Sequence, residues 1–204
     1  MKKICYLISA GEYTGINIIK KEEDYVIAVD GGYGYAMREG ICPDMILGDF
    51  DSLGFVPEEE NIIIHNREKD DTDTMLAIQE GIKLGYKEFV IYCGLGGRLD
   101  HSMANIQTLI YLSKRNMQGK IVGDDVVITA ITNGSIELQK RKNGFFSVFT
   151  FDEKAKGVSI KNAKYELDNA ELYNDVPLGI SNEFIGKTVE ISVKEGTLVI
   201  FENK

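Results

Sequence analysis

The chain has 204 residues, of which 44% are apolar and 27% charged, so it can bury a sizeable core and falls outside the disordered classes. Its net charge of -9 excludes the basic footprint of a nucleic-acid-binding protein. No apolar run approaches the roughly 20 residues that span a bilayer, so we expect no membrane partner. Three widely spaced cysteines, Cys5, Cys42 and Cys93, suit reduced thiols, which predicts a cytoplasmic protein.

Up to about residue 123, short apolar runs alternate with longer helical stretches. This rhythm predicts β-α units around a largely parallel sheet. The expected strands cover residues 3–9, 25–30, 45–48, 61–65, 88–93 and 120–122. We therefore take residues 1–123 as an α/β domain.

Two helices are expected in this domain, over residues 72–84 and 100–116, because apolar residues recur there at three- and four-residue spacing. Gly85 is suited to end the first, and Asp100 stands in the N-cap position of the second. The apolar stripes consist of Met75, Ile78 and Ile82 in the first helix and Met103, Ile106, Leu109 and Ile110 in the second.

After Asp124 the rhythm changes to short β-rich runs separated by turn signals such as Asn133-Gly134. The expected strands cover residues 126–131, 135–138, 145–151, 157–160, 187–193 and 197–201. This pattern predicts an antiparallel sandwich or barrel over residues 124–204. The expected fold is an N-terminal α/β domain with a largely parallel sheet, followed by a C-terminal antiparallel β-sandwich domain.

Asp30, Gly31 and Gly32 follow the second expected strand. In open α/β sheets, ligands bind at the carboxyl ends of the strands. Paired glycines let backbone N–H groups approach a phosphate or a flat ring closely. Asp-Gly is also common in turns, so this motif alone fits either interpretation.

Asp49 and Asp51 follow the third expected strand, within the run from Gly48 to Ser52. Two ionised carboxylates a few ångströms apart repel each other, and a divalent cation stabilises such a pair by neutralising it. A solvated turn is the alternative.

Lys69, Asp70, Asp71, Thr72 and Asp73 precede the first expected helix. Asp71 or Thr72 would cap this helix, and Asp73 would favour the positive end of its dipole. Three acids beside a lysine exceed what a cap needs. They suit a magnesium ligand together with a phosphate partner.

The run from Gly94 to His101 follows the fifth expected strand and leads into the second helix. Its backbone donors, the helix N-terminus and the Arg98 guanidinium predict an anion site. Asp100 fits a cap equally well, and His101 is expected to hydrogen-bond locally rather than bind metal. Oxygen ligands at one sheet edge indicate magnesium or manganese. Together with arginine and lysine, such ligands are typical of sites that transfer a phosphoryl or pyrophosphoryl group.

These four motifs, in this order and followed by a β-rich half with Ser181, Asn182 and Glu183, resemble the thiamine pyrophosphokinase family. The resemblance covers most of the chain. It implies an α/β domain followed by a β-sandwich, in a homodimer whose sites form between subunits. It implies pyrophosphate transfer from ATP to the hydroxyethyl group of thiamine, with Mg²⁺, giving thiamine diphosphate and AMP.

The resemblance also implies roles for individual residues. Asp73 and Asp100 are the expected catalytic residues, and Asp100 would orient or deprotonate the hydroxyl group. Expected metal ligands are Asp49, Asp51 and Asp73, and the expected contacts to thiamine are Asp100, Ser181 and Asn182. Expected contacts to ATP are Asp30, Gly31, Gly32, Lys69, Asp70, Thr72, Gly97 and Arg98. Without the resemblance, the Ser-Asn pair at 181–182 fits a turn.

Two other functions stay open at this point. One is a magnesium-dependent phosphatase with Asp49 as a covalent nucleophile, which explains only one acidic motif. The other is a non-catalytic nucleotide or thiamine sensor. A pure sensor would not need the whole set of Asp49, Asp51, Asp73, Arg98 and Asp100.

Overall fold

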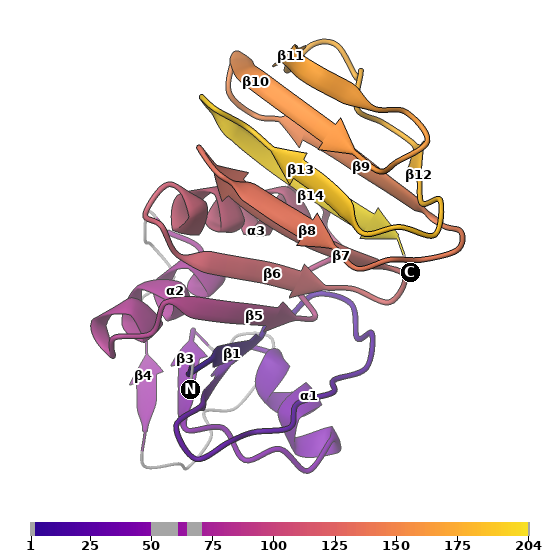
Figure 1. Cartoon of the computed structure of the whole chain (residues 1–204). Coiled ribbons are helices and arrows are strands. Elements are labelled where there is room, and N and C mark those ends of the chain that lie inside the picture. The colour runs from indigo at the N-terminus through magenta and orange to yellow at the C-terminus, as the bar shows by residue number, and fades with distance from the viewer. Residues whose placement is uncertain (1–2, 50–60, 65–70, 204) are drawn as a thin grey trace. The chain divides into compact units, whose positions relative to one another are not determined.

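The structure is a computed structural model, and it describes residues 3–49, 61–64 and 71–203. The chain forms two compact units (Figure 1). The first consists of Met1–Thr108 with Gly119–Asp124, and the second of Leu109–Gln118 with Asp125–Lys204.

The first unit contains a sheet with the strand order β6-β5-β1-β2-β3-β4. The pairs β1–β2, β1–β5, β2–β3 and β3–β4 are parallel, as predicted. The central strands are buried on both faces, because helices cover a parallel sheet on both sides. The strands are β1 (Cys5–Ile8), β2 (Tyr25–Val29), β3 (Met45–Gly48), β4 (Ile62–Ile64), β5 (Glu88–Tyr92) and β6 (Gln118–Val122).

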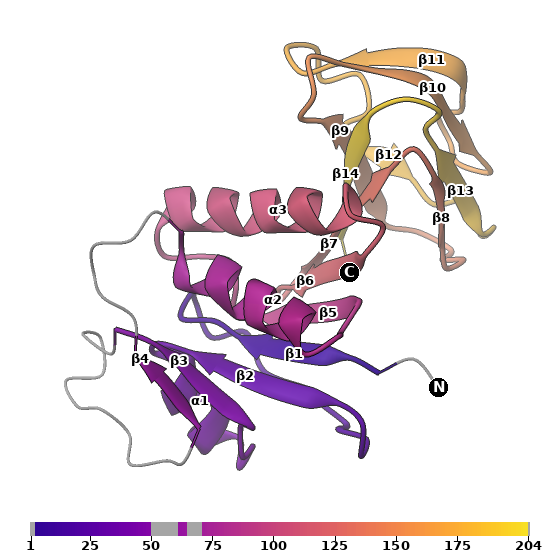
Figure 2. The same ribbon diagram turned by 90° about the vertical axis from the view of Figure 1, so that its left-hand side faces the viewer.

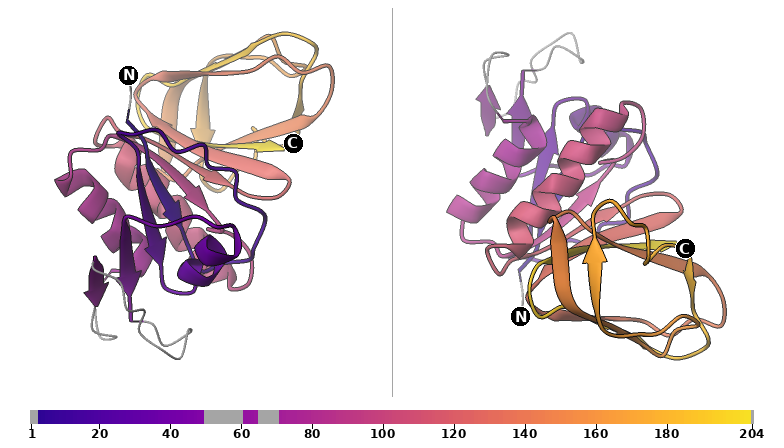
Figure 3. Two further views of the ribbon diagram at one scale, coloured as in Figure 1. Left: turned by 90° about the horizontal axis from the view of Figure 1, so that it is seen from below. Right: turned by 90° about the horizontal axis from the view of Figure 1, so that it is seen from above.

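The helices are α1 (Gly32–Arg38), α2 (Asp73–Lys83) and α3 (Leu99–Ser113). Helix α1 packs through Ala36 on Ile8, whereas Gly81 of α2 lies against Cys5, so alternation along β1 puts the two helices on opposite faces (Figure 3). Helices α2 and α3 run alongside each other (Figure 2). Within the described ranges, no helix has the length and apolar character needed to cross a bilayer.

Both predicted helices are present, but their buried faces differ from the predicted stripes. Helix α2 buries Thr74, Ala77, Ile78 and Gly81, because small residues let it approach the sheet closely. An added Cβ at Gly81 would lie 2.6 Å from the Phe89 ring.

Helix α3 begins one residue earlier than expected, so Asp100 lies in its first turn and the predicted N-cap role is wrong. Met103 is 46% exposed rather than part of the buried face. Helix α1 was not among the predicted helices. Its seven residues are too few to show an apolar stripe, and its glycine-rich start has weak helix propensity.

The second unit is an antiparallel β-sandwich, which confirms the predicted class. Its two sheets have the orders β12-β9-β14-β7 and β11-β10-β13-β8. Alternate side chains from both sheets form one core, which includes Phe146, Val148, Ile160, Ile191 and Ile200. The strands are β7 (Val126–Thr132), β8 (Ser135–Leu138), β9 (Phe145–Thr150), β10 (Lys154–Lys161), β11 (Leu167–Tyr173), β12 (Asn182–Glu183), β13 (Val189–Ser192) and β14 (Thr197–Asn203).

Candidate active site

The candidate site lies at the switch point of the parallel sheet. From β1 the chain continues to β2 on one side, and from β5 it continues to β6 on the other, so β1 and β5 flank the position where the strand order reverses. Beyond β1, the Ser9 N–H donates to the Tyr92 carbonyl at 2.9 Å and the Gly11 N–H to the Cys93 carbonyl at 2.8 Å. The segments that leave these two strands therefore run together along one edge.

A pocket of about 740 Å³ opens at this edge, within the size range of small-ligand sites. It brings together residues that follow five different strands, β1 to β5. Six of the predicted site residues line it: Asp30, Asp49, Thr72, Asp73, Gly97 and Arg98. The structure therefore brings these six residues, from the four predicted motifs, to one edge of the sheet. The predicted residues Gly31, Gly32 and Asp100 are described but are not in the pocket lining.

Three aspartates form the acidic side of the pocket. Asp30, which follows β2, accepts a hydrogen bond through Oδ1 from the Asp49 N–H at 3.0 Å. An added Cβ at Gly48 would lie 1.8 Å from the same Oδ1, so this carboxylate requires glycine at 48. Burial and the negative charges of Asp73 and Asp49 raise the pKa of Asp30 to about 6, against the lowering effect of the Asp49 N–H.

Such crowding of carboxylates suits a divalent cation, and the oxygen donors fit Mg²⁺. Among the described residues, no three histidine, cysteine or acidic side chains gather closely enough to form a complete metal site. Asp51, a predicted ligand, lies outside the described residues, as do the predicted phosphate partners Lys69 and Asp70. Asp49 and Asp73 are the described candidates for the metal.

Thr72 and Asp73 are held by the start of α2. The Thr72 Oγ1 caps the helix by accepting a hydrogen bond from the Met75 N–H at 3.2 Å. Behind them, the Thr74 hydroxyl shares a buried hydrogen bond of 3.2 Å with the Ser9 hydroxyl. The helix start is thereby fixed to the end of β1.

Arg98 and Asp100 form a bidentate ion pair at the start of α3. Arg98 Nη2 lies 2.6 Å from Asp100 Oδ2, and Nε lies 3.2 Å from Oδ1. The hydrogen bonds from Arg98 hold the pKa of the Asp100 carboxyl below its usual range. The two hydrogen bonds from Arg98 fix the direction of the Asp100 carboxylate, an arrangement that suits a group that orients a substrate hydroxyl.

His101 also lines the pocket, and its backbone N–H donates to Asp100 Oδ1 at 3.1 Å. No metal site among the described residues includes its side chain.

Gly31 and Gly32 are among the described residues, but neither lines the pocket. An added Cβ at Gly32 would lie only 2.0 Å from the Ile8 carbonyl oxygen. Glycine at 32 is therefore explained by the close approach of α1 to β1, rather than by a ligand.

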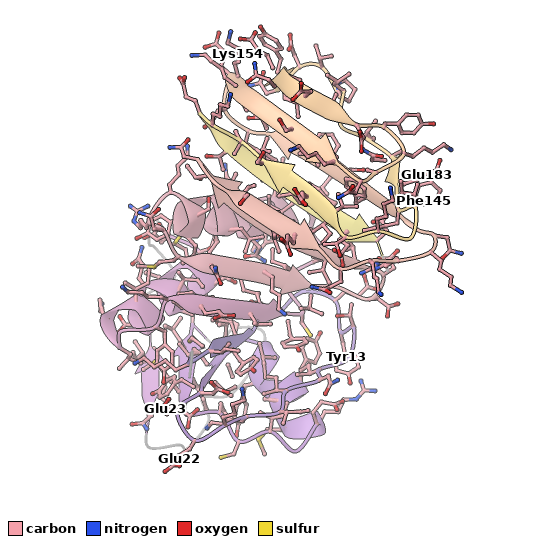
Figure 4. All side chains as sticks on the ribbon, in the orientation of Figure 1. Tyr13, Glu22, Glu23, Phe145, Lys154 and Glu183 are labelled. Carbon is pink, nitrogen blue, oxygen red and sulfur yellow. The ribbon has the colours of Figure 1, made fainter. Side chains whose placement is uncertain are left out.

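Ser181 and Asn182 belong to the second unit. Asn182 is buried, and its side-chain amide forms two hydrogen bonds with the backbone of Tyr165. Oδ1 accepts from the Tyr165 N–H at 3.0 Å, and Nδ2 donates to the Tyr165 carbonyl at 2.7 Å. Ser181 is exposed and has a φ of +56°, with its N–H donating to Ser147 Oγ. Asn182 thus shapes this edge of the sandwich, where Phe145 and Glu183 are cross-strand neighbours (Figure 4).

Several residues that line the pocket were not predicted from the sequence: Ser9, Gly11, Glu12, Thr74 and Asn105. For the first three a signal existed, since Ser9 ends the first expected strand and Ala10-Gly11-Glu12 directly follows it, where ligands bind. Asn105 interrupts the apolar face of an expected helix with a polar side chain. A polar residue at such a position indicates a specific hydrogen-bond partner.

Comparisons with known proteins agree with this arrangement. Residues 16–121 match the family model described as thiamin pyrophosphokinase, catalytic domain. Residues 135–198 match the model described as thiamin pyrophosphokinase, vitamin B1 binding domain.

Two relatives match over most of their length. Thiamine pyrophosphokinase of Bacillus subtilis (strain 168) is 28% identical over 187 residues, which cover 87% of this chain and 86% of the relative. Thiamin pyrophosphokinase 1 of Caenorhabditis elegans is 24% identical over 193 residues, covering 87% and 77%.

Solved structures of similar chains share the fold. The crystal structure of thiamine pyrophosphokinase from Bacillus subtilis aligns with a TM-score of 0.86 and 25% identity, over 100% of this chain and 99% of that one. The thiamin pyrophosphokinase from Geobacillus thermodenitrificans aligns with a TM-score of 0.84 and 23% identity, over 98% and 97%.

Proposed function

This chain belongs to the thiamin pyrophosphokinase family, and we propose that its pocket transfers pyrophosphate from ATP to the hydroxyethyl group of thiamine, giving thiamine diphosphate and AMP. The family match supports this activity rather than a phosphatase or a non-catalytic sensor. One observation carries the proposal: Asp30, Asp49 and Asp73, from three separate segments, line one pocket together with Arg98 of the glycine-rich loop.

The acidic side of the pocket is the proposed metal site. Asp49 and Asp73 would hold Mg²⁺ together with Asp51. When bound, the metal offsets negative charge on the phosphate oxygens as AMP leaves. Asp30 holds the Asp49 backbone through the 3.0 Å hydrogen bond, so its role is to position Asp49.

The glycine-rich loop that lines the same pocket is the proposed phosphate site. The Arg98 guanidinium offers a planar fork for phosphate oxygens, and Gly97 is exposed with open space around its Cα. Lys69, Asp70 and Thr72 would complete the contacts to ATP.

Thiamine would bind next to Asp100, which orients the hydroxyl group for attack on the β-phosphorus. The thiazolium of thiamine is a cation, so a carboxylate-rich pocket attracts it. Ser181 would contact the aminopyrimidine, and Asn182 would hold the backbone around it.

We further propose a homodimer in which the second unit of one chain completes the thiamine site of its partner. Several apolar side chains of the second unit are about half exposed: Phe145 (50%), Val176 (52%), Leu178 (56%), Ile180 (53%) and Ile185 (45%). A second copy would cover such residues. The three free thiols also support a cytoplasmic location, where ATP is supplied.

The test is to incubate the protein with ATP, Mg²⁺ and thiamine and to separate the products. Equal amounts of AMP and thiamine diphosphate, formed only when thiamine is present, are expected. Release of inorganic phosphate without thiamine, with an aspartyl-phosphate that can be trapped, would favour the phosphatase. Binding of ATP or thiamine with no product would favour the sensor.

A further inference from the structure

The glycine-rich loop between β5 and α3 is held by hydrogen bonds from two directions. From α3, Asn105 Nδ2 donates to the Gly94 carbonyl at 2.7 Å, and Ser102 Oγ accepts from the Gly96 N–H at 3.1 Å. From the segment after β1, the Glu12 N–H donates to the Leu95 carbonyl at 2.8 Å. Three successive loop residues therefore have a backbone group fixed by another segment.

The two α3 side chains are buried, although they are polar. Asn105 is 7% exposed and Ser102 is 9% exposed, both on the inward face of the helix. Burial of a polar group costs free energy unless it is hydrogen-bonded, and an apolar residue would serve helix packing at least as well. Their polarity is explained by the loop.

Thr108, further along the same helix, provides the contrast. It is fully buried, but its hydroxyl donates to the Ala104 carbonyl at 3.1 Å, within α3 itself. A buried hydroxyl on this helix thus has no need of the loop as a partner.

These contacts decide which loop groups are left for a ligand. The Gly96 N–H is occupied by Ser102, so it is not a donor for phosphate in this conformation. Gly97 has a φ of +63° and no atom within 4 Å of an added Cβ, and it lines the pocket together with Arg98. A loop with glycine at 94, 96 and 97 has wide conformational freedom, and ordering it on binding would reduce affinity.

We infer that Ser102 and Asn105 are positioning residues of the nucleotide site. They hold loop 94–98 in its binding conformation before ATP arrives, so that Gly97 and Arg98 face the triphosphate. Neither side chain needs to touch the reacting atoms. This inference rests on the proposed function, because it takes ATP as the ligand of the loop.

The experiment compares four variants. Asn105→Leu removes the donor to Gly94 with little change of volume and no added charge. Ser102→Ala removes the acceptor for Gly96, whereas Ser102→Thr keeps a hydroxyl. Thr108→Val is the matched control, because it removes a buried hydroxyl from the same helix without touching the loop.

The dissociation constant of ATP is measured by calorimetry with Mg²⁺, beside the KM values for ATP and thiamine. We expect Asn105→Leu and Ser102→Ala to weaken ATP binding about 5- to 50-fold, as expected for one lost buried hydrogen bond. The KM for thiamine should rise less than the KM for ATP, since Asp100 lies on the helix and only its partner Arg98 belongs to the loop. Ser102→Thr and Thr108→Val should bind ATP like the unsubstituted protein.

Amide hydrogen exchange at residues 94–98 provides a readout that does not depend on turnover. Exchange should be faster in Asn105→Leu and Ser102→Ala and unchanged in Thr108→Val. Unchanged ATP affinity in the first two variants would overturn the inference. The inference would also be overturned if Thr108→Val lost ATP affinity to the same extent and the loss in all three variants followed a lower melting temperature.

The proposed function can fail separately. If the unsubstituted protein binds ATP but forms no AMP with thiamine, the activity is wrong, while the comparison of ATP affinities still decides the role of the two residues. If it binds no ATP, both are wrong.

Discussion

The Asp30 carboxylate accepts a hydrogen bond from the Asp49 backbone at 3.0 Å, and this bond joins the ends of the neighbouring strands β2 and β3. It fixes the backbone of a proposed metal ligand by means of a charged group from another strand. The arrangement leaves no room for a side chain at Gly48.

The first prediction therefore concerns Gly48→Ala. The new Cβ would lie 1.8 Å from Asp30 Oδ1, so Asp30 has to move and the bond to Asp49 breaks. We expect the free energy of unfolding to fall by about 1–3 kcal/mol, measured with urea. AMP formation should fall at least about tenfold, because Asp49 loses its fixed position.

Gly134→Ala is the matched control for this change. There the added Cβ comes no closer than 3.5 Å to the Thr132 carbonyl oxygen, which is an ordinary contact. If Gly48→Ala were as active as this control, the Asp30–Asp49 bond would not matter for the site.

The second prediction concerns Asp73→Asn. Turnover should fall by about 100-fold or more, since a carboxylate proposed to hold the metal is lost. Folded stability without metal should stay the same or rise, because the change removes a like charge beside Asp30. Mg²⁺ should raise the melting temperature of the unsubstituted protein more than that of the variant.

Asp71→Asn makes the same chemical change two residues earlier. Asp71 is exposed and accepts a hydrogen bond from Gln79 Nε2 at 3.0 Å, so its loss should leave turnover within about threefold. Equal turnover in both variants would remove Asp73 from the metal site.

The third prediction concerns Arg98→Lys. Lysine keeps the charge but loses the planar fork that pairs with Asp100 at 2.6 and 3.2 Å and that would bind phosphate oxygens. We expect the KM for ATP to rise about tenfold. Arg115→Lys, at the other end of the α3 segment, should leave that KM unchanged, and a similar rise in both would contradict the assignment.

The fourth prediction is a pH dependence of stability at Asp152. Its carboxylate accepts hydrogen bonds from the Thr197 N–H at 2.7 Å and from Lys114 Nζ at 3.0 Å. Partial burial alone would raise its pKa, but these two donors lower it below the ordinary value of 3.8. The ionised carboxylate therefore stabilises the fold above that pH, and the effect is lost as the pH falls through the folded pKa.

Asp152→Asn should accordingly lower the free energy of unfolding by about 1–2 kcal/mol at pH 7. The difference from the unsubstituted protein should shrink in urea titrations as the pH falls below the ordinary pKa of 3.8. Asp168→Asn, at an exposed position, should have little effect at either pH. A deficit of constant size across this range would show that the charge of Asp152 is not involved.

The fifth prediction concerns the proposed dimer. Leu178→Glu places a charge among half-exposed apolar side chains of the second unit. We expect the chain to change from dimer to monomer in light scattering, with loss of turnover if sites are shared. Ile19→Glu, at a position that is 80% exposed in the first unit, should stay dimeric and active. A monomeric unsubstituted protein with full activity would contradict both proposals.

Much of the fold follows from local patterns. Strands such as β3 and β8 match their predicted ranges, because short apolar or alternating runs between turn signals are typical of β-strands. The family resemblance depended on motifs that each follow a strand. The sequence placed Asp30, Asp49, Asp73 and Arg98 at one edge, since parallel strands end on the same side of a sheet.

Only the tertiary structure decided which groups of those motifs are free for a ligand. Gly32 is required by the Ile8 carbonyl, the Gly96 N–H is taken by Ser102, and the Asn182 amide is engaged by Tyr165. A hydrogen bond or a close approach depends on positions within a few tenths of an ångström, and residue type and spacing do not carry that information. The sequence thus determined which chemistry is present, and the packing determined which atoms are available for it.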